Sequence, residues 1–276
     1  MTDRLPLRLK FWGVRGSIPT PEAGTLGHGG NTACVQVQYG DRVSLIFDAG
    51  SGSRQLGHVL VNGSDSGDRT TPIFLSHCHW DHIHGLPFFA PLYRPDWKVV
   101  FHSTYPAVEL EARLGAQLKP PYFAAEAAVR AEREYRQIGS EGVQIDGLTV
   151  RSFPLNHPGG CAGYRIDSPS RSVVYATDHE HGDPASEQAL QQWAKDVDIL
   201  IYDAQFTPEE YPKRRGWGHS TWLEGTRVAS DSGVKQLVLF HHDPEHDDQT
   251  LSRMLAEAQA EFPNTICAKE GLAVSL

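Results

Sequence analysis

Four histidines and one aspartate fall within eight consecutive residues of this chain. The stretch HCHWDHIH, positions 77 to 84, contains His77, His79, Asp81, His82 and His84. Imidazole nitrogens and carboxylate oxygens are protein ligands of zinc and related divalent ions. His77 and His79 lie two residues apart, so in extended backbone their side chains point the same way. Asp81 and His82 follow where the strand gives way to a turn, and they can therefore face a different point.

Three isolated residues elsewhere complete a metal-binding pattern. Each follows a segment that reads as a buried strand: His157 in FPLNH, Asp178 in VVYATD and His241 in LVLFHH. With the first group they give seven nitrogen and oxygen ligands, too many for one tetrahedral zinc but suited to two ions that share a carboxylate. The alternative is a chance grouping of histidines in surface turns, which this combination disfavours.

Alternating strands and helices are expected to position these residues. Apolar patterning predicts strands within 7–13, 32–40, 42–50, 72–77, 143–157, 161–168, 171–178, 197–206 and 236–242. It predicts helices in the middle of 120–139 and over 221–233 and 248–262. Several strands in both halves end at His or Asp, which indicates an α/β sandwich with a site along the strand ends. We expect residues 1–276 to form one domain.

Composition narrows the partners and the compartment. The 276-residue chain has a formal net charge of −9, which argues against a large nucleic-acid surface. It leaves room for a small anionic substrate held by metal ions. The chain contains no apolar run long enough to predict a membrane-spanning helix. Its N-terminus does not have the pattern of a secretory signal peptide. The four cysteines are scattered without a CxxC pair, which fits a reducing cytoplasm.

The HxHxDH motif with its downstream His, Asp and His resembles the metallo-β-lactamase superfamily over nearly the whole chain. The resemblance implies an αββα sandwich of two mixed β-sheets flanked by helices, with a site for two divalent ions. Zinc is the expected metal, while manganese or iron occurs in some branches. One ion would be held by His77, His79 and His157, the other by Asp81, His82 and His241, with Asp178 bridging them.

Two further features are similar to the ribonuclease Z and phosphodiesterase branch. Lactamases proper carry Cys or His at the place of Asp178, whereas a bridging Asp looks like the phosphodiesterase and glyoxalase branches. The segment YDAQFTPEEYPKRRGWGHST resembles the ribonuclease Z region in which an acidic residue precedes GHST, here Asp203 and His219. The opening WGVRGSIPTP, followed by GGNTACVQV, is similar to that branch as well.

The chemistry of phosphodiester hydrolysis gives His219 a reason. The reaction needs an attacking hydroxide, stabilisation of negative charge, and a proton for the leaving oxygen. A water molecule that bridges two metal ions would supply the hydroxide near neutral pH, because the ions lower its pKa. The ions do not readily protonate the leaving alkoxide. A histidine oriented by a carboxylate does so, which makes Asp203, His219 and the metal ligand Asp81 the candidate catalytic residues. The alternative for this segment is a helix cap by Ser220 or Thr221, and both roles are compatible.

The expected substrate is a small or cyclic nucleotide-type phosphodiester. Ribonuclease Z carries a long tRNA-gripping arm between the counterparts of His157 and Asp178, where only twenty residues intervene here. Three alternatives stay open: a carboxyl ester, thioester or lactone hydrolase on the same metals, an RNA-processing nuclease, and a non-catalytic metal-binding sensor. The resemblance also implies a homodimer, because relatives commonly complete their pocket across a dimer.

Three residues are candidates for support or substrate contact. Asp48, at the end of a strand, is expected to support a ligand histidine, with a plain turn residue as the alternative. Arg15 is a candidate phosphate contact, and His28 a candidate substrate contact from the N-terminal loop.

Two histidines beside the ligands need separate treatment. His84 has the spacing to lie away from the metals and is expected to be structural. His242 follows His241 directly, and because strand neighbours face opposite sides, the sequence leaves open which of the two is the ligand.

Overall fold

Along the strands of this protein, buried residues alternate with more exposed ones. In β1 (Leu7–Gly13), Leu7, Leu9 and Phe11 are fully buried, whereas Arg8 between them is exposed. Such alternation is what a strand with one face on the core requires. The computed structural model describes residues 5–40, 43–63, 69–124 and 126–276.

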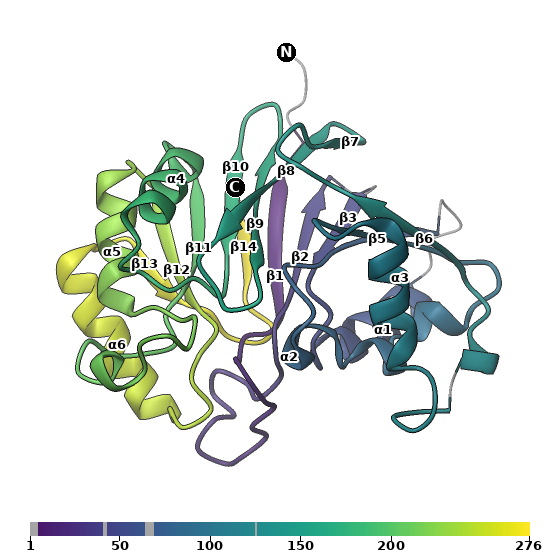
Figure 1. The fold of residues 1–276 in the computed structure, drawn as a ribbon. Helices are drawn as coiled ribbons and strands as arrows, with labels where there is room; N and C mark the ends of the chain where they lie inside the picture. Colours follow the sequence, from purple (N-terminus) through teal and green to yellow (C-terminus); the bar gives the residue numbers. More distant parts are fainter. Residues whose placement is uncertain (1–4, 41–42, 64–68, 125) are drawn as a thin grey trace.

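The described strands form two seven-stranded mixed sheets (Figure 1). The first has the order β14 (Ala273–Ser275), β1, β2 (Cys34–Tyr39), β3 (Val43–Phe47), β4 (Thr70–Phe74), β5 (Lys98–Ser103), β6 (Glu132–Gln137). The second has the order β13 (Thr265–Cys267), β12 (Gln236–Phe240), β11 (Ile199–Asp203), β10 (Ser172–Ala176), β9 (Cys161–Asp167), β8 (Leu148–Leu155), β7 (Val143–Ile145).

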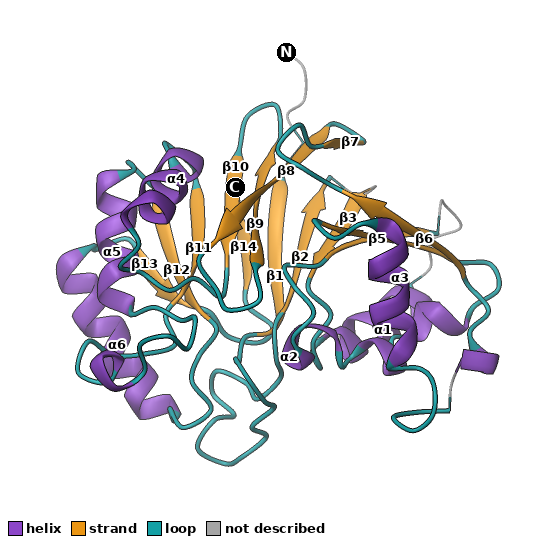
Figure 2. Ribbon diagram, viewed as in Figure 1, coloured by secondary structure: helices purple, strands orange, loops and turns teal. Residues whose placement is uncertain are grey.

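Helices cover the outer face of each sheet (Figure 2). On the first sheet lie α1 (Ser53–Asn62), α2 (Trp80–Ile83) and α3 (Ala107–Ala116), with short 3₁₀ turns at Leu86–Phe88, Ala90–Tyr93 and Glu126–Ala128. On the second lie α4 (Pro184–Ala194), α5 (Trp222–Asp231) and α6 (Asp248–Glu261), and a 3₁₀ turn occupies Tyr211–Lys213. One apolar cluster joins the two sheets, and a separate cluster lies under each helix layer. The predicted αββα sandwich is confirmed.

Parallel pairing brings the carboxyl ends of several strands to one edge. β3, β4, β5 and β6 are mutually parallel, as are β10, β11, β12 and β13. β8 is antiparallel to β9, which is antiparallel to β10, so β8 and β10 run the same way. Residues that follow β3, β4, β8, β10, β11 and β12 therefore emerge on a common side of the sandwich.

One local prediction was wrong. The helix expected in the middle of 120–139 is a 3₁₀ turn followed by β6, which extends the first sheet parallel to β5. There Tyr135 stacks on Phe101 with ring centroids 5.4 Å apart, so sheet pairing outweighs the helix propensity of the Ala and Glu residues. The β structure predicted within 143–157 is a hairpin of β7 and β8, in which Asp146 and Gly147 both take positive φ, the backbone of a tight hairpin turn.

None of the helices among the described residues is both long enough and apolar enough to cross a membrane.

Candidate metal and catalytic site

The structure brings the seven predicted ligands together at the common edge of the strands. Donor atoms in each of three groups lie within 4.8 Å of one another. The first group is His77, His79 and His157; the second is Asp81, His82, Asp178 and His241; the third is Asp178, Asp203, His219 and His241. The pairing of the first two groups is the one that the resemblance implied.

Three imidazoles have their outer nitrogen occupied by an acceptor. His82 Nδ1 donates to Asp48 Oδ2 at 2.8 Å, His157 Nδ1 to the Gly218 carbonyl at 2.8 Å, and His241 Nδ1 to Gln205 Oε1 at 3.0 Å. A proton on Nδ1 leaves a lone pair on Nε2, so each ring presents an acceptor to the interior of the site.

The inner nitrogens fit a cation. His82 Nε2 and His241 Nε2 lie 3.2 Å apart, as do His79 Nδ1 and His157 Nε2. Two lone pairs at that distance repel unless a proton or a metal ion lies between them. His77 Nε2 is buried without a hydrogen-bond partner in the described chain. Burial lowers the pKa of His77 well below its ordinary value, which keeps the ring neutral and able to bind a metal.

Asp178 lies between the two ligand groups. Its Oδ1 is 3.8 Å from His77 Nε2 and 4.0 Å from His157 Nε2, on the side of the first group. Its Oδ2 is 3.2 Å from His82 Nε2 and 3.3 Å from His241 Nε2, on the side of the second. One carboxylate oxygen therefore faces each group, which is the placement a bridging ligand needs.

Three strand-end residues take left-handed backbone to aim their side chains. Asp48, Asp178 and His241 have φ of 58°, 54° and 61° and directly follow or lie two residues beyond β3, β10 and β12. Left-handed backbone is disfavoured for residues with a side chain and is concentrated at functional sites. The coincidence at three strand ends indicates that the sandwich holds these residues in place for the site.

Asp48 organises a buried network behind His82. It is fully buried, and besides His82 it accepts hydrogen bonds from the Ser76 amide and hydroxyl and from the Tyr175 hydroxyl. With these contacts, the carboxylate fixes the orientation of His82 from behind, as strand-end carboxylates near metal sites do. Asp48 therefore contacts a predicted ligand histidine, as expected from the sequence.

His219 and Asp203 form a hydrogen-bonded pair beside the second ligand group. His219 Nδ1 lies 2.8 Å from Asp203 Oδ2, and Asp203 Oδ1 accepts from the backbone amides of Gln205 and Ser220. Burial lowers the pKa of His219, but the Asp203 carboxylate, together with those of Asp178 and Asp81, outweighs burial and raises the pKa to about 9. Thr221 is the N-cap of α5 and accepts from the Glu224 amide, so the helix cap is a neighbouring residue rather than His219.

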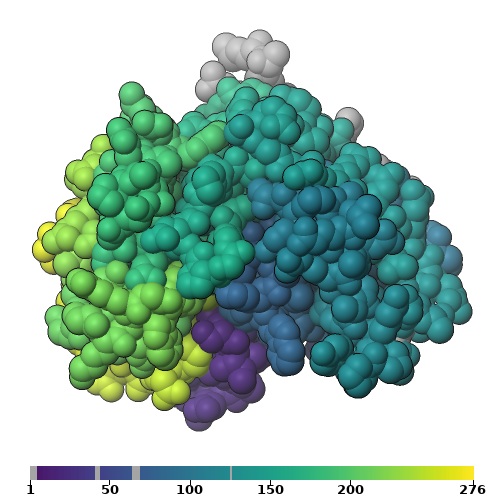
Figure 3. All heavy atoms as spheres, in the orientation of Figure 1, coloured from purple at the N-terminus to yellow at the C-terminus, as the bar shows by residue number. Residues whose placement is uncertain are grey.

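The N-terminal loop closes one side of the site. The Ser17 amide donates to Asp81 Oδ2 at 2.8 Å. In the space-filling view, the purple N-terminal segment lies between the blue segment around α2 and the yellow-green C-terminal half (Figure 3). Arg15 is fully buried and donates to the carbonyls of Gly29, Asp243 and His246, so it ties this loop to the segment after β12 instead of facing a substrate. His28 is half-buried and pairs with Asp248 at 2.9 Å.

His241, and not His242, lies among the grouped donor residues. His241 belongs to the second and third groups, whereas His242 is buried on the other side, 2.9 Å from the Ala268 carbonyl. His84 lies outside all three groups, and its Nδ1 is 2.6 Å from the Trp80 carbonyl.

Two further residues support the predicted ligands. Gln205 orients His241, and the only signal for it is its position two residues after Asp203. Glu180 accepts hydrogen bonds from the amides of Gly216 and Gly218 and from the Tyr211 hydroxyl. Gly218 has φ of 89°, and a Cβ there would approach His157 Nδ1 to 2.2 Å, so the glycine of GHST is required by the site itself.

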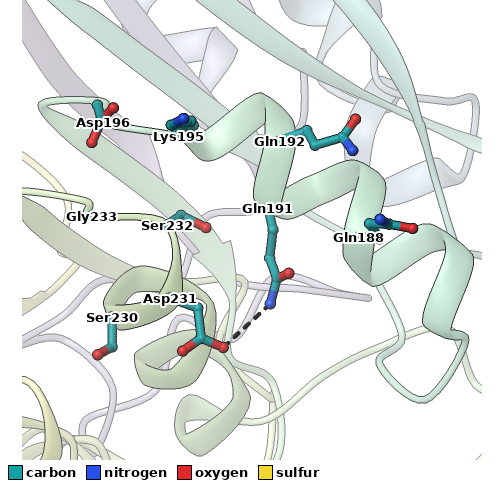
Figure 4. Close-up of a pocket in the computed structure, with 9 residues that line it drawn as sticks. All are labelled: Gln188, Gln191, Gln192, Lys195, Asp196, Ser230, Asp231, Ser232 and Gly233. Atoms are coloured by element: carbon teal, nitrogen blue, oxygen red, sulfur yellow. Dashed lines mark hydrogen bonds between the residues drawn. The ribbon is translucent and has the colours of Figure 1, made fainter.

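A second hollow on the surface contains none of the predicted site residues. It lies between α4 and the end of α5 and is lined by polar side chains, with Gln191 Nε2 3.3 Å from Asp231 Oδ2 (Figure 4). No histidine or cysteine lines it.

The sequence matches the family described as the beta-lactamase superfamily domain over residues 44–242. That span includes all seven predicted ligands, together with Asp203 and His219. The chain belongs to the beta-lactamase superfamily. The predicted membership is therefore confirmed, and with it the expectation of a hydrolase fold that is typical of divalent-metal enzymes.

Curated relatives of this superfamily member extend over almost its full length. Ribonuclease BN of Cronobacter sakazakii is 25% identical over 98% of this chain and 100% of its own. Ribonuclease Z of a Synechococcus strain is 25% identical over 98% of this chain and 96% of its own.

Solved structures share the superfamily fold. The metallo-β-lactamase fold protein YhfI of Bacillus subtilis superposes with a TM-score of 0.74 at 21% identity, covering 99% of this chain and 100% of the other. A diphosphatase from the PhnP family superposes with a TM-score of 0.70 at 21% identity, covering 99% and 98%. At these identities the likeness establishes the fold.

Proposed function

We propose that this protein is a dinuclear metal-dependent phosphodiesterase that acts on small or cyclic nucleotide-type phosphodiesters. The observation that supports it is the His219–Asp203 pair, which lies within 4.8 Å of Asp178 and His241 donor atoms. A hydrolase that needed only an activated water would have no use for a carboxylate-oriented histidine at this point. A phosphodiester with an alkoxide leaving group needs one.

The seven donor residues would hold two divalent ions, one in each ligand group with Asp178 between them. Such ions lower the pKa of a bound water from 15.7 towards about 7 and stabilise negative charge on the phosphate. Zinc suits the mixture of imidazole and carboxylate ligands, and manganese or iron is the alternative.

The chain's own residues would orient the substrate and move the proton. Asp203 holds His219 through Nδ1, so Nε2 is the nitrogen that can reach the leaving oxygen. His219 Nε2 makes no hydrogen bond within the described residues and is not enclosed. During cleavage of the P–O bond, it would donate its proton to the departing alkoxide, while Asp203 stabilises the histidinium before transfer.

The connection between His157 and Asp178 favours a small substrate over tRNA. The twenty intervening residues form the β9–β10 hairpin, whose strands pair directly, and leave no length for an arm. An RNA-processing nuclease is the second candidate, since the full-length relatives above are named ribonuclease BN and ribonuclease Z. The alignment to the first runs over 331 positions, more than the 276 residues of this chain, so that relative holds segments that this protein lacks.

A substrate panel tests the proposal. We expect zinc- or manganese-loaded protein to hydrolyse bis(p-nitrophenyl) phosphate and the dinucleotide uridylyl-uridine (UpU). Turnover of p-nitrophenyl acetate, a thioester and a lactone should be lower by at least about a hundredfold in kcat/KM, a difference of about 2.7 kcal/mol in transition-state stabilisation. Efficient acyl hydrolysis without phosphodiester turnover would replace the proposal with its ester-hydrolase alternative, and cleavage of precursor tRNA in preference to UpU would favour the nuclease.

Three expectations from the sequence accompany this proposal as predictions. They are a single domain over residues 1–276, action in the cytoplasm, and assembly as a homodimer.

A further inference from the structure

The loop immediately before His219 carries three consecutive cations without ion-pair partners. This segment, residues 211–218 (the 211–218 loop), contains Lys213, Arg214 and Arg215. Among the described residues, none of the three side chains makes a salt bridge or a hydrogen bond. Several other arginines pair with a carboxylate, for example Arg113 on α3 with Glu109 and Arg151 on β8 with Asp167. In a protein with a net charge of −9, these three adjacent cations stand out because they form no salt bridge among the described residues.

Two aromatic rings hold Arg214 on the His219 side of the loop. Its guanidinium carbon lies 4.8 Å from the centre of the Trp217 ring and 5.4 Å from that of Phe206. Phe206 is fully buried, and its ring meets the His219 ring edge-on at 5.9 Å. Phe206 thus contacts both the guanidinium and the proposed proton donor. Trp217 is 57% exposed, so the other wall of the arrangement is open to solvent.

Glu180 binds the backbone of the loop and makes no salt bridge with Arg214 among the described residues. Its Oε1 accepts from the Gly216 amide at 2.7 Å, and its Oε2 accepts from the Gly218 amide at 2.8 Å. Both oxygens of this carboxylate are therefore directed at loop backbone. A cation that is already fixed in place loses little freedom when it binds a ligand, which favours binding.

We propose that Arg214, held between Phe206 and Trp217, binds a second phosphate group located on the leaving-group side of the substrate. The inference rests on the proposed phosphodiesterase function and names its substrate class: a phosphodiester whose departing alcohol carries a phosphate. The planar guanidinium presents paired N–H donors that match phosphate oxygens, and stacking on aromatic rings leaves the edge of the guanidinium free for them. Water adds its hydroxyl to phosphorus, the P–O bond to the alcohol breaks, and the alcohol oxygen receives the proton from His219.

Three dinucleotides that share one scissile linkage test the inference. UpU has no extra phosphate, pUpU carries one on the 3′-linked nucleoside, and UpUp carries one on the 5′-linked nucleoside. The products of UpU show which nucleoside departs as the alcohol. We expect the substrate with its phosphate on that nucleoside to have a kcat/KM at least about tenfold above that of UpU, the effect of about 1.4 kcal/mol. The isomer with its phosphate on the other nucleoside should have about the same kcat/KM as UpU.

Arg215 provides a matched control in the same loop. Its guanidinium carbon lies 5.6 Å from the Tyr211 ring, and it lines a separate hollow with Asn156, His181 and Asp183. We expect Arg214→Ala to bring the ratio of kcat/KM for the dinucleotide with the leaving-side phosphate to kcat/KM for UpU down to about one. Arg214→Lys should give an intermediate ratio, and Arg215→Ala should leave the ratio unchanged. Turnover of UpU itself should stay within about threefold in all three variants, which also shows that they are folded.

A binding measurement separates this inference from the chemistry. Uridine 3′,5′-bisphosphate should alter the fluorescence of Trp217 in metal-free protein, and the concentration for half the change should rise at least about tenfold in Arg214→Ala. The Trp217→Phe variant identifies the signal. If UpU is cleaved but a leaving-side phosphate gives no gain, or if Arg215→Ala loses the gain as fully as Arg214→Ala, the inference is wrong while the phosphodiesterase proposal stands. If bis(p-nitrophenyl) phosphate is cleaved but none of the three dinucleotides is, the inference is likewise wrong; if neither kind of substrate is cleaved, the proposed function itself fails.

Discussion

Asp178→Asn is expected to reduce the bound metal from two ions to one and to lower kcat/KM for phosphodiesters by at least about a thousandfold. The exchange keeps the volume of the side chain but replaces one oxygen by an amide nitrogen, which has no lone pair to offer a metal ion. Because one carboxylate oxygen faces each ligand group, one group loses its shared ligand. A loss of several kcal/mol of charge stabilisation corresponds to a rate factor of about a thousand. Metal analysis of the purified variant and steady-state kinetics check both parts.

Asp231→Asn is the matched control for this exchange. Asp231 lies at the end of α5 beside the surface hollow of Figure 4, outside the three donor groups. It should retain two ions and full turnover. An Asp178→Asn protein that keeps two tightly bound ions and most of its activity would show that Asp178 is not the bridging residue.

His219→Ala is expected to discriminate between substrates by their leaving groups. Hydrolysis of UpU, which releases an alkoxide, should slow by about 10²–10⁴-fold, the usual contribution of a general acid. Hydrolysis of bis(p-nitrophenyl) phosphate should slow by less than about tenfold, because nitrophenolate departs without a proton. Steady-state rates of the two substrates with the same enzyme preparation give the ratio directly.

The helix cap provides an internal check on this variant. Thr221, not His219, accepts the hydrogen bond from the Glu224 amide at the start of α5, so the helix should survive the substitution. The exposed His58 on α1 offers a histidine control, since His58→Ala should leave both rates unchanged. Equal slowing of UpU and the nitrophenyl ester in His219→Ala would argue for a positioning role instead of an acid role.

Much of the site was predictable because metal ligands are chemically distinctive and follow strands. His157, Asp178 and His241 could be selected from the sequence since each ends an apolar run, and parallel strands bring such ends to one edge. The left-handed backbone of Asp178 and His241 was not predictable, because no glycine or turn pattern marks these two positions, whereas a turn residue was one of the two alternatives for Asp48. The sandwich imposes that conformation.

The parts that failed depend on contacts distant in sequence. The residues of β6 favour a helix locally, and only pairing with β5 makes them a strand. Arg15 carries a charge that suggested a phosphate contact, but three carbonyls from distant segments enclose it. The role of Glu180 depends on loop amides more than thirty residues later in the chain. Side-chain type alone gives no access to such contacts.

The central claim is that two ions and the His219–Asp203 pair together hydrolyse a phosphodiester. Titration of metal-free protein with zinc or manganese, followed by the turnover of UpU, tests it most directly. We expect activity to rise until two equivalents are bound, and to vanish again on chelation. Protein that binds two equivalents of either metal and leaves UpU and bis(p-nitrophenyl) phosphate intact would contradict the claim.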